Sequence, residues 1–151
     1  MTMKTEHRKF MSLALAEADK AAAEGEIPVG AVIIKNGEVI SEAHNETEKR
    51  KSPLAHAELI ATEKALSCLG TKYLSDCTLY VTLEPCPMCM GALLHARIGS
   101  VVFGAFDEKT GSLGSVTDLS DLSFFRKPQI MGGYMEEECK KVLTDFFKSV
   151  R

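Results

Sequence analysis

Hydrophobic and polar positions alternate along the chain with two different periods. In residues 4–23, which are rich in Ala, Leu, Lys and Glu, the apolar Phe10, Leu13 and Ala14 recur at steps of three and four. This spacing is typical of an amphipathic helix, and Gly25 follows as a stop signal. We therefore expect the chain to begin with a helix over residues 4–23.

Two β-prone runs follow, over residues 29–35 and 38–45, and Asn36-Gly37 joins them. A type I′ turn requires positive φ at both central residues, which Asn and Gly tolerate best. The sequence therefore predicts a β-hairpin, followed by a polar loop over residues 46–52.

The rest of the chain alternates strand-like and helix-like segments. We expect helices over residues 55–66, from Pro85 to about Gly99, and over 136–149. Strands are expected over 77–84 and 100–106, with a weaker signal over 129–134. A polar loop is expected over 107–121. Strands that alternate with helices favour parallel pairing. The predicted fold class is α/β, with a mixed sheet of about five strands covered by helices in one domain over residues 1–151.

Composition narrows the classes of function. A chain of 151 residues with 45% hydrophobic residues suits one globular domain with a sizeable core. No apolar run is long enough to span a bilayer, and the N-terminus is too polar for a secretory signal, so we expect cytoplasmic residence and no membrane partner. The net charge of −3 supplies no general attraction for nucleic acid, so no DNA partner is expected and any RNA needs a local basic patch.

The chain has five cysteines, an odd number that argues against a disulfide framework. In a reducing compartment a Cys-x-x-Cys pair is more typical of a metal or redox site. The remaining cysteines and most histidines lie in apolar or helical contexts, so we expect them to be packed structural residues: Cys68, Cys77, Cys139, His7, His44 and His95.

Two short motifs carry the chemistry, His56-Ala57-Glu58 and Pro85-Cys86-Pro87-Met88-Cys89. The cysteines lie at an expected helix N-terminus, where the dipole stabilises thiolate, the form that binds metal. With His56 they make three protein ligands for zinc and leave a fourth position for water, which is the catalytic pattern. Glu58 is then free to move protons, provided that the metal lies over the helix end, because side chains two residues apart point in different directions along a helix.

Two other interpretations of these motifs are weaker. A structural zinc module would normally have a fourth Cys or His ligand close by, and it would not need Glu58. A thiol-redox pair would leave both His56 and Glu58 unexplained.

The pattern H-x-E…P-C-x-x-C is the known signature of zinc deaminases that act on bases. Beyond it, the chain resembles the bacterial tRNA-specific adenosine deaminases over nearly its whole length, through IPVGAVI, AHAE, TLYVTLEPCPMC, ARIG, VVFGA, DEKTGSLGS and DFF. The resemblance implies a three-layer α/β/α cytidine-deaminase-like fold and a homodimer. It also implies hydrolytic conversion of adenosine to inosine at the wobble position of the anticodon of an arginine tRNA.

The resemblance also assigns roles residue by residue. It implies one zinc ion per subunit, bound by His56, Cys86 and Cys89, with Glu58 as the proton shuttle while activated water attacks C6 of the purine. Asn45 would hydrogen-bond the flipped base, Asp107 and Lys109 would contact the anticodon, and Phe146 would help to close the binding surface. Judged without the resemblance, Asn45 would be a strand-end residue and Asp107 a loop cap.

Two positions depart from the family pattern, because Phe106 replaces a polar residue and Leu54 replaces a threonine. RNA affinity should rest on a few cations such as Lys109, Lys148 and Arg151, and should therefore fall steeply with salt. The alternative is a deaminase of a free nucleobase or nucleoside, guanine or cytidine, because the zinc chemistry would be identical.

Overall fold

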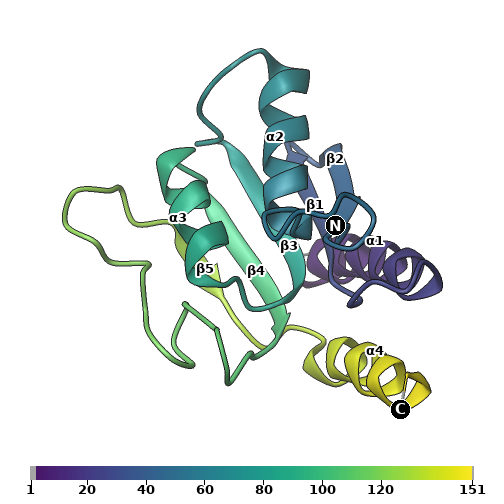
Figure 1. Ribbon diagram of the computed structural model, residues 1–151. Coiled ribbons are helices and arrows are strands. Elements are labelled where there is room, and N and C mark those ends of the chain that lie inside the picture. The colour runs from purple at the N-terminus through teal and green to yellow at the C-terminus, as the bar shows by residue number, and fades with distance from the viewer. Residues whose placement is uncertain (1–2, 151) are drawn as a thin grey trace.

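The computed structural model describes residues 3–150 and the side chains of residues 5–150, so Arg151 lies outside the described residues. A five-stranded sheet lies between two layers of helices (Figure 1). The elements in chain order are α1 (Met3–Ala23), β1 (Gly30–Lys35), β2 (Glu38–His44), α2 (Ala57–Leu69), β3 (Cys77–Leu83), α3 (Pro87–His95), β4 (Ser100–Ala105), β5 (Gln129–Met131) and α4 (Glu136–Ser149).

The sheet has the strand order β2-β1-β3-β4-β5. β1 pairs antiparallel with both β2 and β3, whereas β3–β4 and β4–β5 are parallel. The hairpin turn has φ of 52° at Asn36 and 76° at Gly37, as a type I′ turn requires. The predicted mixed sheet, its hairpin and its parallel second half are therefore confirmed.

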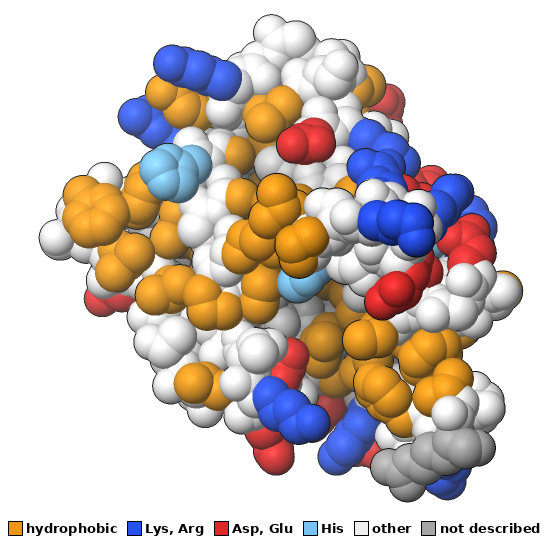
Figure 2. Space-filling model, viewed as in Figure 1, with side chains coloured by type: hydrophobic (Ala, Val, Ile, Leu, Met, Phe, Trp, Pro, Cys, Tyr) orange, Lys and Arg blue, Asp and Glu red, His pale blue; other side chains and the backbone are white. Residues whose placement is uncertain are grey.

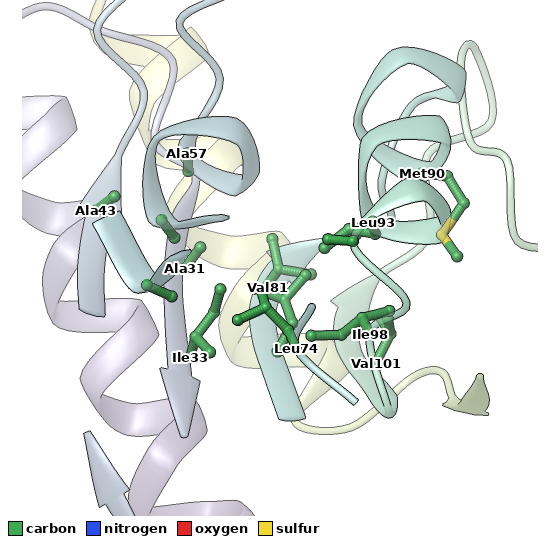
Figure 3. Close-up of a cluster of buried hydrophobic side chains, with 14 of the residues drawn as sticks. Ala31, Ile33, Ala43, Ala57, Leu74, Val81, Met90, Leu93, Ile98 and Val101 are labelled. Carbon is green, nitrogen blue, oxygen red and sulfur yellow. The ribbon is translucent and has the colours of Figure 1, made fainter. Parts of the chain in front are cut away.

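α2 and α3 pack on one face of the sheet, and α1 and α4 pack on the other. Figure 3 shows the first layer, in which Leu93 points from α3 toward Val81 on β3. On the second face, a Cβ atom at Gly30 would overlap the Ala14 carbonyl oxygen, so α1 lies directly on the backbone of β1. The α/β/α layering implied by the resemblance is confirmed.

Two of the expected core residues are exposed. Cys77 and Cys139 are buried as expected, but Cys68 lies on the solvent face of α2, one turn after the exposed Lys64. His95 is exposed at the end of α3, where it meets the Phe125 ring edge-on at a centroid distance of 4.9 Å. Both predictions were wrong, because an apolar neighbourhood in sequence does not show which side of a helix faces the sheet.

The ends of three elements meet at one edge of the molecule: the carboxyl end of β3 and the N-termini of α2 and α3. In α/β sheets, ligands bind at the carboxyl ends of parallel strands, close to helix N-termini. Within the described residues, no helix is both long and apolar enough to cross a membrane.

Candidate functional site

Three candidate ligands from two helix ends converge on one point. His56 precedes the first residue of α2, and Cys86 precedes the first residue of α3. The Nδ1 atom of His56 lies 3.6 Å from Sγ of Cys86 and 3.5 Å from Sγ of Cys89. Residues that are 30 and 33 positions apart are thus within reach of one ion.

The three donors fit a tetrahedral zinc ion. With Zn–S of about 2.3 Å and Zn–N of about 2.0 Å, a tetrahedral angle separates sulfur from nitrogen by about 3.5 Å, in agreement with the observed spacing. Two thiols and an imidazole are also the donor types that zinc prefers. Among the described residues this group has three members, so a fourth coordination position is left for a solvent molecule.

The two thiols differ in their affinity for a proton. Hydrogen bonds from Cys89 and His56 lower the pKa of the Cys86 thiol to about 4. The hydrogen bond that Cys89 donates to Cys86, together with burial, raises the pKa of Cys89. The metal-free cluster therefore keeps a proton on Cys89, and a metal ion that binds both thiolates must displace it.

Glu58 is the second residue of α2, and its side chain is only 5% exposed. Burial raises the pKa of its carboxyl group to about 7, against the opposing effects of hydrogen bonds and of the charge of His56. Its carboxyl group contacts the Cys89 thiol. A carboxyl group with a pKa near neutrality can both accept and return a proton at working pH, as a general acid–base catalyst must.

Asn45 lies beside the cluster and joins two segments. Its Nδ2 donates to the Ile27 carbonyl at 3.0 Å, and its Oδ1 accepts from the Ala57 N–H at 2.9 Å. The second bond caps the N-terminus of α2, where His56 makes no side-chain cap of its own. One N–H and one lone pair of the amide remain for a purine, so a substrate contact there is compatible with this structural task.

Asp107 is largely occupied within its own loop. Its Oδ1 accepts from the N–H groups of Lys109 and Thr110 at 3.0 and 3.1 Å, and its Oδ2 accepts from the Thr110 hydroxyl at 2.8 Å. This is the loop cap that the residue type alone indicates. The Lys109 side chain is exposed on the same loop.

Phe146, the remaining predicted contact residue, is partly exposed, and so are the two positions that depart from the family pattern, Phe106 and Leu54. Phe146 is half-buried on α4, and its ring lies 5.5 Å from that of Phe147. Phe106 meets the buried Phe103 edge-on and remains 46% exposed, and Leu54 is 58% exposed. Among the described residues, the ring contact of Phe146 is with Phe147, whereas Asn45 and Glu58 contact residues of the ligand cluster or next to it.

The sequence reasoning missed Glu84, which is only 1% exposed. Its carboxylate accepts from the N–H groups of Asp107, Leu113 and Ser115 at 3.0, 2.8 and 3.1 Å, and also from the Ser115 hydroxyl. A Cβ atom at Gly111 would overlap this carboxylate. Glu84 thus holds the 107–115 loop against the segment that leads into Cys86; the only signal in the sequence was an acidic residue at the end of an apolar strand.

The strand order, the helix-end cluster of one imidazole and two thiols, and the buried carboxyl group beside it together define a deaminase of the cytidine-deaminase-like fold. A family model for MafB19-like deaminases matches residues 5–151.

Comparison with known proteins narrows this class. The chain is 45% identical to a tRNA-specific adenosine deaminase of Bacillus subtilis, over 97% of this chain and 92% of the relative. It is 47% identical to another of Aquifex aeolicus, over 94% of each chain. A solved structure from a study of A-to-I editing by tRNA:A34 deaminases superposes with a TM-score of 0.86 at 39% identity, covering 90% of this chain and 99% of the other. The chain belongs to the tRNA-specific adenosine deaminase family.

Proposed function

We propose that this protein converts adenosine to inosine by hydrolysis at the wobble position of the anticodon of an arginine tRNA. The observation that supports the chemistry is that two cysteines and a histidine, which are typical zinc ligands, converge beside the buried carboxyl group of Glu58. The relatives named tRNA-specific adenosine deaminases support adenosine in a tRNA as the substrate.

In this proposal, His56, Cys86 and Cys89 hold one zinc ion per subunit, which supplies a water molecule whose pKa is lowered to about 7. Glu58 removes a proton from the attacking water and delivers it to N1 of the adenine ring, which makes C6 electrophilic. It then passes the second proton of that water to the departing amino group, so that adenosine and water yield inosine and ammonia. Because Glu58 is shielded from bulk solvent, its proton stays with the substrate.

The reacting base must leave its stack before it can reach these groups. This costs little in a single-stranded anticodon loop, where bases are already splayed. The free N–H and lone pair of Asn45 would hold the flipped purine, and Asp107, Lys109 and Phe146 would contact the nucleotides around it. Cations such as Lys109 and Lys148 would supply the phosphate contacts in a chain with a net charge of −3.

An anticodon stem-loop with adenosine at the wobble position tests the substrate, assayed for inosine beside free guanine and cytidine. Conversion of the stem-loop, without turnover of the free compounds, is the expected result. Turnover of guanine or cytidine alone would replace the proposal with its rival, a free-base deaminase with the same zinc chemistry.

Glu58→Ala tests the assigned chemistry. Zinc content should stay at one ion per subunit, because the three ligands are untouched, while inosine formation should fall by at least about 10³-fold. Substantial activity in this variant would rule out Glu58 as the proton shuttle. The exposed Glu63→Ala on the same helix is the matched control and should leave turnover unchanged.

The same proposal includes the oligomeric state of the protein and its location in the cell. A homodimer is expected from the family resemblance, and sedimentation would measure it. Cytoplasmic residence fits both a tRNA substrate and thiolate ligands, which need a reducing environment.

A further inference from the structure

A pocket lies at the end of α3 that is farther from the metal ligands. Its volume is about 480 Å³. Helix geometry places its His95 side roughly 14 Å along α3 from Cys86. Its lining combines aromatic and basic side chains: Tyr73, Ser75, His95, Arg97, Phe124, Phe125 and Arg126. In Figure 2, basic, histidine and hydrophobic side chains meet at the upper left edge of the visible face, over this part of the fold.

Arg97 adopts a backbone conformation that an arginine rarely takes. α3 ends in a Schellman motif, in which the N–H groups of Ile98 and Arg97 donate to the carbonyls of Leu93 and Leu94, both at 3.0 Å. This motif places Arg97 in the left-handed region, with φ of 55°. Glycine is the usual residue at that position, because its missing Cβ removes the steric cost.

The same chain ends α2 with the same motif, and there the left-handed residue is Gly70, with φ of 62°. The N–H groups of Thr71 and Gly70 donate to the carbonyls of Leu66 and Ser67 at 3.3 Å. The backbone at the end of α3 would therefore accept glycine at position 97. Its arginine side chain must contribute something that the turn itself does not need.

The Arg97 side chain is held in place and keeps its charge available. Its guanidinium lies over the Tyr73 ring, 4.3 Å from the centroid, and this stacking orients the group at the pocket. Arg126, which also lines the pocket, donates to the Ser75 carbonyl at 3.5 Å. Within residues 3–150, neither arginine forms an ion pair with a carboxylate. Two unneutralised guanidinium groups in an acidic protein favour an anionic ligand.

Exposed aromatic rings supply the second half of the pocket. The Phe124 ring is 75% exposed and lies 4.8 Å from the Phe125 ring, which in turn contacts His95. An exposed ring beside unpaired arginines is the combination that binds single-stranded nucleic acid, because bases stack on the ring while arginines neutralise the phosphates.

We propose that this pocket is a second RNA-binding site, at which Arg97 and Arg126 bind a phosphate of the substrate RNA and Phe124 stacks on a base. The proposal rests on the proposed function, because it assumes an RNA substrate. The separation of roughly 14 Å between Cys86 and His95 corresponds to about four stacked nucleotides. One strand can therefore occupy both sites at once.

Arg97→Gly tests the site without risking the fold. Because glycine suits the left-handed conformation, the melting temperature should be unchanged or higher. Affinity for the anticodon stem-loop at 0.1 M salt should fall about fivefold, and the slope of log K against log salt should become shallower by about 0.8, as expected for the loss of one phosphate contact. KM for the stem-loop should rise with kcat unchanged, and a trinucleotide with a central adenosine, too short to reach the pocket, should be deaminated as by the wild type.

Two further variants sharpen the comparison. Phe124→Ala should weaken stem-loop binding with an unchanged salt slope, because it removes stacking and no charge. Arg8→Ala removes one exposed positive charge from α1, on the opposite face of the sheet, and should leave both affinity and slope unchanged.

Each alternative outcome has a definite meaning. If the wild type deaminates the stem-loop and Arg97→Gly binds it with the same affinity and slope, the second site is refuted while the proposed function stands. A change in oligomeric state on sedimentation of Arg97→Gly would instead assign the pocket to a protein interface and would also overturn the proposal. If the wild type neither binds nor deaminates the stem-loop, the proposed function itself fails.

Discussion

Replacing Glu84 with Gln should lower the free energy of unfolding measurably and loosen mainly the 107–115 loop. Four donors converge on the two carboxylate oxygens, two on each oxygen. A glutamine amide keeps one oxygen but places an NH₂ group where two donors already point. The Ser115 hydroxyl can turn and accept, but at least one backbone N–H is left without a partner in either orientation of the amide.

The magnitude follows from these bonds. An orphaned buried N–H costs about 1–3 kcal/mol, and each remaining bond loses roughly 1 kcal/mol when its acceptor is no longer charged. Relief from burying a charge offsets part of this sum, so we expect a loss of about 3 kcal/mol in the free energy of unfolding. With a typical total of about 5–15 kcal/mol the variant should still fold, with a urea midpoint lower by roughly 1–2 M.

Urea unfolding measures the total loss, and amide hydrogen exchange shows where it falls. The amides of Asp107, Leu113 and Ser115 should exchange faster in Glu84→Gln. Glu26→Gln is the matched control, because Glu26 is also 1% exposed and accepts from the N–H groups of Glu48 and Lys49 at 3.0 and 2.8 Å. It should loosen the 46–52 loop instead. A loss below about 1 kcal/mol, or equal effects of both variants on both loops, would refute the reasoning.

Two further predictions concern stability. Gly30→Ala should lower the free energy of unfolding by about 2–4 kcal/mol, because its Cβ would overlap the Ala14 carbonyl oxygen and push α1 off the sheet; an unchanged urea midpoint would contradict this packing. Burial alone lowers the pKa of His44, but hydrogen bonds to Glu17 and Glu24 outweigh burial and raise it. This stabilisation is complete below the unfolded-state pKa of about 6.5 and is lost as the pH rises through the higher folded-state pKa. The difference in unfolding free energy between the wild type and His44→Gln should therefore shrink over that range, and a pH-independent difference would exclude the effect.

The elements of the fold follow from local sequence signals. Asn36-Gly37 marks the hairpin because two adjacent residues decide whether positive φ is tolerated, and Pro87 marks the first turn of α3 because only there is its missing N–H harmless. The candidate metal site could also be predicted from the sequence, because the spacing of the motifs places His56 and the two cysteines at expected helix starts. Each of these inferences needs only a few neighbouring residues.

The limits of such reasoning appear where a residue's role depends on distant partners. Asn45 caps α2 from a different element, and Glu84 holds a loop whose contact residues lie 23 to 31 positions further along the chain. His95 and Cys68 occupy helical positions whose facing is decided by how each helix packs on the sheet. No periodicity within one segment encodes these relations.

The sequence by itself therefore determined the order of helices and strands, the hairpin, and the identity of the residues that could bind zinc and move protons. Only the tertiary structure decided that His56 meets Cys86 and Cys89 at zinc spacing, that burial brings the pKa of Glu58 to about 7, and that Arg97 borders a pocket at the far end of α3. The physical reason is the distance along the sequence over which the responsible interactions act. Backbone preferences are set by adjacent residues, whereas distances, burial and charge arise from the packing of segments that are remote in sequence.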